Sequence, residues 1–177
     1  PNPRNCGGSG GCGGATAELA YDMVRQNGVP LDAIWPYTAG TTGQTGNCVN
    51  YAASASPKIG IGGYRKLPTN QYMPLVQALY QRGHPIAVAV DASMWNFYQS
   101  GIYSDSEYGS AGDFTVNHEV TLVGYMGRQG SSMGYYTIKN SWGPMWGERG
   151  FIRVEMKDNE QQHCGWDNDS HIGLACD

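Results

Sequence analysis

Two segments in the second half of the chain combine residue types that can perform acid–base chemistry. His118 opens the apolar run NHEVTLVGY, which places its imidazole at the start of a buried strand. Asn140 and Trp142 follow another apolar run, and Trp146 comes four residues later. An Asn amide oxygen can accept a hydrogen bond from a His ring and select its tautomer, while an indole keeps water away. A histidine held in this way can stabilise a thiolate nucleophile.

Both segments also have simpler explanations. A single histidine is more often structural, bonded to a neighbouring carbonyl. Two tryptophans in a Gly-rich hairpin can form a hydrophobic plug. The chemical hypothesis therefore depends on the elements that bring the His and the Asn together.

Apolar periodicity and turn residues predict an α+β chain, with helices first and strands second. We expect no regular structure at 1–13, a three-turn helix from about Gly14 that stops at Asn27–Gly28, and an ordered loop at 29–57. The rest predicts a strand at 59–64, a helix at about 71–82 capped by Thr69 or Asn70, and strands at 86–90, 116–126, 135–140 and 150–156. The second half should be mainly antiparallel.

Composition excludes several classes of function. The 177 residues carry a formal charge of −4 with 15% charged residues, which argues against a nucleic-acid partner and against disorder. No stretch approaches the roughly 18 apolar residues of a membrane span, and we expect no signal peptide within this chain. His84, His163 and His171 are not clustered with acids at ligand spacing, so they are interpreted as surface or structural, and no metal or organic cofactor is expected.

Five cysteines without Cys-x-x-Cys spacing suit an oxidising compartment, either lysosomal, vacuolar or extracellular. They are Cys6, Cys12, Cys48, Cys164 and Cys176. Because the number is odd, one thiol is predicted to be free or bonded to another chain. Asn168-Asp169-Ser170 is a candidate glycosylation acceptor.

Five segments together resemble the papain-like cysteine proteases, the family of cathepsins L and B. They are CGGATAELAYDMV, IWPYTA, HPIAVAVDASMWNFYQSGIY, NHEVTLVGY and NSWGPMWGERGFIRV, which cover nearly all of the chain in the family's order. The resemblance implies a two-lobe papain-like fold with the active-site cleft between the lobes. Residues 1–65 would be the remainder of a helical lobe, and 66–177 a β-barrel-like lobe whose tail returns toward the first. It also implies peptide-bond hydrolysis, with His118 and Asn140 catalytic and Trp142 and Trp146 supporting them.

The family's nucleophile motif, Cys-Gly-Ser/Ala-Cys-Trp/Tyr, is absent from this sequence. Cys12 precedes a helix, but it lies only 106 residues before His118, whereas the family spacing is about 130–150. Cys12 instead resembles the cysteine of the family's Cys-Asn-Gly-Gly turn. We therefore expect the nucleophile before Pro1 or on another chain, as a disulfide-linked or tightly packed N-terminal segment or light chain. The chain alone is predicted to be inactive.

The resemblance also implies disulfides and a substrate site. Cys6 would pair with Cys48, and Cys12 with the missing segment. The family's partner of Cys164 lies a few residues before the His, and this sequence has no Cys there, so Cys164 is left to pair with Cys176, which departs from the family. The turn at Gly14 and Ala15 would contact the backbone of a peptide or protein substrate. The main specificity pocket would be lined by Ala17, Ala89, Asn117, Glu119 and Asp169. Two acids there favour a basic side chain or a narrower pocket, unless Glu119 points into solvent.

A second hypothesis is a non-catalytic papain-fold relative that acts as a binding or structural component. The intact set of His118, Asn140, Trp142 and Trp146 favours the peptidase, because a binding protein has no chemical need of all four. Glu119 stands where the family usually has Gly or Ala, which favours the relative. The altered Gly turn at Cys12 points the same way.

Overall fold

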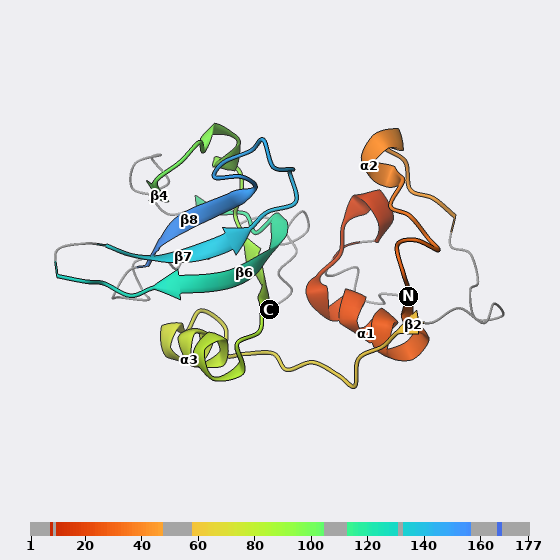
Figure 1. Ribbon diagram of the computed structural model, residues 1–177, viewed down its shortest axis with the longest axis horizontal. Coiled ribbons are helices and arrows are strands. Elements are labelled where there is room, and N and C mark those ends of the chain that lie inside the picture. The colour runs from red at the N-terminus through yellow and green to blue at the C-terminus, as the bar shows by residue number, and fades with distance from the viewer. Residues whose placement is uncertain are drawn as a thin grey trace. The chain divides into compact units, whose positions relative to one another are not determined.

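The computed structural model describes residues 8, 10–47, 58–104, 113–130, 133–156 and 166–167 (Figure 1). By its internal contacts the chain divides into two units, Pro1–Lys66 and Leu67–Asp177. Among the helices within these ranges, none has the length and apolar character needed to cross a membrane.

The first unit is built around the helix α1, Ala17–Asn27, which confirms the helix predicted there. It ends as predicted at Gly28, whose φ is +67° and whose N–H donates to the carbonyl of Val24 at 2.8 Å. A Cβ at Gly28 would lie 3.0 Å from Cβ of Lys58. Glycine is therefore needed both for the helix stop and for the close approach of the chain near Lys58.

The remainder of this unit corrects the sequence-based prediction. The 3₁₀ turn η1, Gly11–Gly13, lies in a stretch expected to be irregular. The predicted loop at 29–57 contains the strand β1, Val29–Pro30, and the short helix α2, Ala39–Thr42. The strand expected at 59–64 is only β2, Lys58–Ile59. β1 and β2 pair antiparallel, so both exist through a long-range contact that local patterns do not reveal.

A five-stranded sheet in the order β3-β6-β7-β8-β4 forms the second unit. The strands are β3, Ile86–Val90; β6, His118–Met126; β7, Gly134–Lys139; β8, Phe151–Met156; and β4, Ile102–Tyr103. The four longer ones confirm the predicted strands within two residues, and they pair antiparallel. β4 was not predicted, and it runs parallel to β8. A separate short pair, β5, Asp113–Phe114, and β9, Trp166–Asp167, is also parallel.

The helix α3, Tyr72–Arg82, precedes this sheet and confirms the second predicted helix. Its predicted cap is wrong: the residue at the cap position is Gln71, which makes no side-chain capping bond. Asn70 has a φ of +54°, so it turns the chain before the helix instead of capping it. The helix ends at Gly83 in the left-handed conformation.

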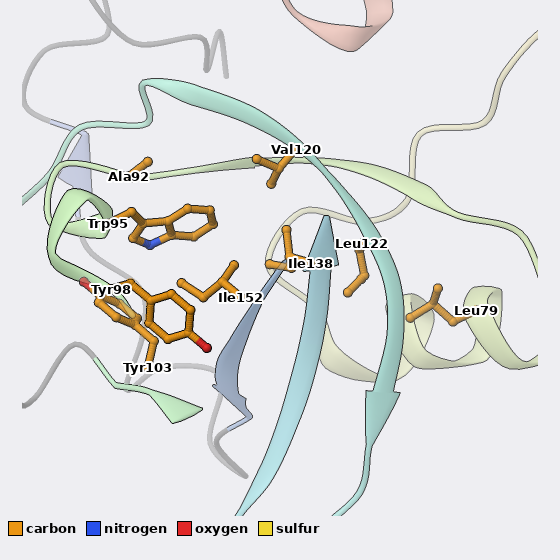
Figure 2. Packing of buried hydrophobic residues seen from close by; sticks show 9 residues of the cluster. All are labelled: Leu79, Ala92, Trp95, Tyr98, Tyr103, Val120, Leu122, Ile138 and Ile152. Atoms are coloured by element: carbon orange, nitrogen blue, oxygen red, sulfur yellow. The ribbon is translucent and has the colours of Figure 1, made fainter. Parts of the chain in front are cut away.

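Large side chains from the sheet, from α3 and from the 3₁₀ turn η3, Trp95–Phe97, form the core of this unit (Figure 2). Leu79 of α3 lies next to Leu122 of β6, and Ile138 of β7 and Ile152 of β8 lie between Leu122 and Trp95 (Figure 2). Alternation along β8 buries Ile152 and Met156. Trp95, Tyr98 and Tyr103 close the end of the core opposite Leu79 (Figure 2).

Truncating the centre of this core should destabilise the protein strongly. Ile152 is 0% exposed, so Ile152→Ala should lower the free energy of unfolding by about 2–5 kcal/mol, measured by urea denaturation. Val123→Ala is the control, because Val123 is 39% exposed on β6 of the same sheet and its truncation should cost less than about 1 kcal/mol. Equal losses for the two variants would contradict this description of the core.

Candidate active site

His118 and Asn140 are held at neighbouring strand ends of one sheet. His118 is the first residue of β6 and pairs with Val90 of β3. Asn140 directly follows β7, and its backbone N–H donates to the carbonyl of Gly150 at 2.9 Å. Because β6 and β7 are paired, their ends bring the two side chains together. Nε2 of His118 lies 2.8 Å from Oδ1 of Asn140, so the contact expected from the sequence is present.

This contact selects one tautomer of the imidazole. Oδ1 of Asn140 also accepts the backbone N–H of Ser141 at 2.8 Å, which identifies that atom as the amide oxygen. An amide oxygen only accepts hydrogen bonds, so Nε2 of His118 must carry a proton and donate it. The neutral ring therefore has its lone pair on Nδ1. It can take up and release a proton at Nδ1 without breaking its bond to Asn140.

Asn140 is 7% exposed, and its amide nitrogen is buried without a hydrogen-bond partner among the described residues. An unpaired buried donor costs about 1–3 kcal/mol. The orientation of the side chain is therefore set by the two contacts of Oδ1 and not by Nδ2.

Aromatic rings surround the imidazole on more than one side. Trp142 stacks on His118 with ring centroids 5.3 Å apart and an interplanar angle of 29°. The buried Trp95 meets the same ring edge-on, at 6.4 Å and 89°. Trp146 contacts Trp142 edge-on at 5.1 Å and stacks on Trp95 at 6.1 Å. These contacts restrict the ring of His118 to one orientation and limit the access of water to it.

The backbone before His118 is tied to the turn after β3. The amide of Asn117 accepts the N–H of Ala92 at 3.0 Å and donates to Oγ of Ser93 at 3.0 Å. The carboxylate of Asp91 accepts the N–H of Thr115 at 3.1 Å. Both ends of the Asn117 amide are thus used within the protein, and its role toward a substrate stays a prediction.

A family model described as papain family cysteine protease matches residues 3–174 of the chain. The chain belongs to this family. Among its relatives are vignain of Ricinus communis, 34% identical over 88% of this chain and 41% of its own, and cathepsin K of Mus musculus, 35% identical over 89% and 45%. The chain thus spans less than half the length of these curated relatives.

Solved structures agree with this assignment. The bromelain protease from Ananas comosus, solved in complex with the E64 inhibitor, has a TM-score of 0.70 and 33% identity. The match covers 89% of this chain and 68% of that one. The likeness confirms the predicted α+β papain fold for the part of the family's structure that this chain represents.

The remaining predicted site residues of this papain-family chain fall into three groups. Gly14, Ala15 and Ala17 belong to the first unit, as does Cys12, which is exposed and free and whose N–H donates to Oγ1 of Thr45 at 2.9 Å. In the second unit, Ala89 and Glu119 are directly paired across β3 and β6. Outside the described residues lie Asp169, Asn168 and the predicted disulfides of Cys6, Cys48, Cys164 and Cys176. Within the described ranges no three His, Cys, Asp or Glu residues gather as a metal site requires.

Several residues that support the site were not singled out from the sequence. Trp95 and Tyr98 stood in a quoted segment without a role, and Glu148 and Arg153 were noted only as part of the hairpin. Glu148 accepts two hydrogen bonds from the guanidinium of Arg153, at 2.6 and 2.8 Å. An acid and an arginine on either side of the turn at Gly150, as in GERGFIR, could have indicated this pair.

The Glu148–Arg153 pair should give the papain-family chain a pH-dependent stability. The hydrogen bonds from Arg153 hold the pKa of Glu148 below its usual value, and the N–H of Gly101 adds to this effect. A lowered folded pKa means that the stabilisation is complete above the ordinary glutamate value of about 4.5. It is lost as the pH falls through the folded value.

Glu148→Gln should therefore lower the free energy of unfolding by about 1–2 kcal/mol at pH 7, with the difference from wild type narrowing below about pH 4. Denaturant titrations from pH 3 to 7 measure it. Asp22→Asn, which breaks the exposed pair with Arg25, should cost less than about 0.5 kcal/mol. A difference for Glu148→Gln that stayed constant across this range would contradict the role assigned to its charge.

Proposed function

We propose that this chain supplies the acid–base part of a cysteine endopeptidase, and that the nucleophile is a thiol outside these 177 residues. The observation that carries the proposal is the 2.8 Å contact between Nε2 of His118 and Oδ1 of Asn140. It leaves Nδ1 as the position at which the ring exchanges protons. A thiol placed at Nδ1 can transfer its proton to the ring and remain as a thiolate beside an imidazolium.

Peptide hydrolysis then proceeds in two stages. The thiolate attacks the substrate carbonyl, the peptide C–N bond breaks, and the proton on Nδ1 passes to the departing amine. In the second stage Nδ1 takes a proton from water, whose oxygen attacks the thioester, and returns it to the thiol. Asn140 keeps the Nε2 proton in place throughout, so one ring nitrogen performs every transfer.

The sequence supports a nucleophile elsewhere, because none of the five cysteines stands in the family's nucleophile motif. Relatives more than twice as long as this chain leave room for such a segment. It would be a tightly packed or disulfide-linked N-terminal segment or light chain. We place the whole protein in a lysosomal, vacuolar or extracellular compartment, where such links persist.

The chain alone should show no measurable hydrolysis of a fluorogenic peptide. The protein carrying its natural preceding or partner segment should hydrolyse it, and His118→Ala in that protein should lower kcat by a factor on the order of 10⁴ or more. Labelling with a thiol-directed epoxide should be fast on the added segment and slow on Cys12.

Two outcomes would overturn this assignment. Fast labelling of Cys12 at pH 5–6 that His118→Ala abolishes would make Cys12 the nucleophile. A complete protein with Ser or Gly at the nucleophile position would be the non-catalytic relative, a binding or structural component.

We also propose that the main specificity pocket prefers a basic side chain. The support is the direct pairing of Glu119 with Ala89 across β3 and β6. The side chain of Ala89 is small and exposed, so it leaves space on the strands beside the carboxylate of Glu119. In the complete enzyme, Glu119→Gln should reduce the preference for Arg over Leu at this pocket roughly tenfold, since a charge-assisted hydrogen bond is lost. Parallel kcat/KM measurements on matched peptides give this ratio. An unchanged ratio would mean that Glu119 does not face the pocket.

A further inference from the structure

The carboxylate of Glu148 joins three segments of the second unit. One oxygen accepts the backbone N–H of Gly101 at 2.9 Å and a guanidinium N–H of Arg153, while the other accepts the second guanidinium N–H. The hydroxyl of Tyr98 donates to the carbonyl of Gly101 at 2.7 Å and accepts the backbone N–H of Arg153 at 3.3 Å. Glu148 thereby holds the hairpin between β7 and β8 against the chain that leads into β4.

Trp146 lies beside this network. Its indole ring contacts Tyr98 with centroids 5.6 Å apart, and its N–H donates to the carbonyl of Trp95 at 3.1 Å. The turn between Trp146 and Glu148 has little room to move: a Cβ at Gly147 would lie 2.7 Å from the carbonyl oxygen of Phe151 and 3.0 Å from the Tyr98 ring. A shift of Glu148 must therefore move Trp146.

The same contacts continue to the imidazole. Trp146 packs edge-on against Trp142, and Trp142 stacks on His118. Trp142 is itself 38% exposed, so its position depends on the packing of its ring against Trp146. The backbone of the hairpin also connects to Asn140, whose N–H donates to Gly150, and the N–H of Gly150 donates to Trp146.

From these contacts we infer that Glu148 and Arg153 are positioning residues, which hold Trp146 and thereby fix Trp142 over the His118–Asn140 pair. Neither touches the imidazole. Their bidentate geometry matters because an ion pair held by two parallel bonds resists rotation, unlike a single charge contact. The consequence for catalysis rests on the proposed function, whereas the consequence for the imidazole can be tested in this chain alone.

The experiment follows the Nε2 proton of His118 by NMR in the 177-residue chain labelled with ¹⁵N-histidine. The signal is assigned by its loss in His118→Ala. In the wild type we expect the Nε2-protonated tautomer and slow exchange of this proton with water. Glu148→Gln and Arg153→Met should each accelerate the exchange roughly tenfold. The reason is that Trp142 is then held less firmly over the hydrogen bond between His118 and Asn140. Since the two residues act as a unit, the exchange rate in the double variant should not appreciably exceed the rate in either single variant.

Glu155→Gln is the matched control, because it also replaces a glutamate carboxylate by an amide, but at a position in β8 where the carboxylate accepts the hydroxyl of Ser104. Its exchange rate should stay within about twofold of the wild type. Arg153→Lys keeps the charge without the fork and should give an intermediate rate if Arg153→Met fails to fold. Folded variants of Glu148 and Arg153 whose exchange matches the control would overturn the proposal.

In the complete enzyme, Glu148→Gln should lower kcat about tenfold and leave KM unchanged, since Glu148 orients the base and binds no substrate. An inactive parent protein would refute the proposed function, yet the NMR experiment would still decide the positioning role. Faster exchange of the Nε2 proton in Glu148→Gln with an unchanged kcat would show that the positioning role of Glu148 has no effect on catalysis.

Discussion

The hydrogen bond from Nε2 of His118 to Oδ1 of Asn140 is the constraint around which the second unit is organised. An imidazole has two nitrogens of similar basicity, and without a fixed partner the proton can occupy either one. A carboxylate in place of Asn140 would add a negative charge, and a hydroxyl could donate as well as accept. The amide oxygen is neutral and only accepts, so it selects the tautomer without neutralising the positive charge that the ring would carry beside a thiolate in the proposed mechanism.

The fold makes this selection by placing the two residues at the paired ends of β6 and β7 and by building the site from the core itself. Trp95 is 2% exposed and belongs to the hydrophobic cluster, yet it also touches the imidazole. Because packed cores are close to crystal density, a ring held by core residues moves little. Within the described part of the chain the buried amide nitrogen of Asn140 has no hydrogen-bond partner, which shows the cost of keeping its oxygen in place.

The sequence was most informative where local pattern and packing agree. The central strands and both longer helices follow from apolar periodicity, because each buries one continuous face. The short strands β1 and β4 could not be predicted in this way, since each has only two residues and exists through its partner. The strand predicted at 59–64 is reduced to the two residues of β2 for the same reason. The pairing of His118 with Asn140 was found because the residue types define the chemistry. The contacts of Glu148 were not, because Gly101 lies 47 residues away and carries no side chain to suggest a role.

The charges of the site are divided between groups that titrate and groups that do not. The proposed reaction requires one ring to gain and lose a proton, and supporting groups that titrated over the same range would make the geometry change during it. Arg153 holds the pKa of Glu148 below its usual value, and burial raises the pKa of Tyr98 above its own. Both shifts move these groups away from the range in which an imidazole titrates. The hairpin therefore keeps its ion pair, and with it the position of Trp146, at every pH above the lowered pKa of Glu148.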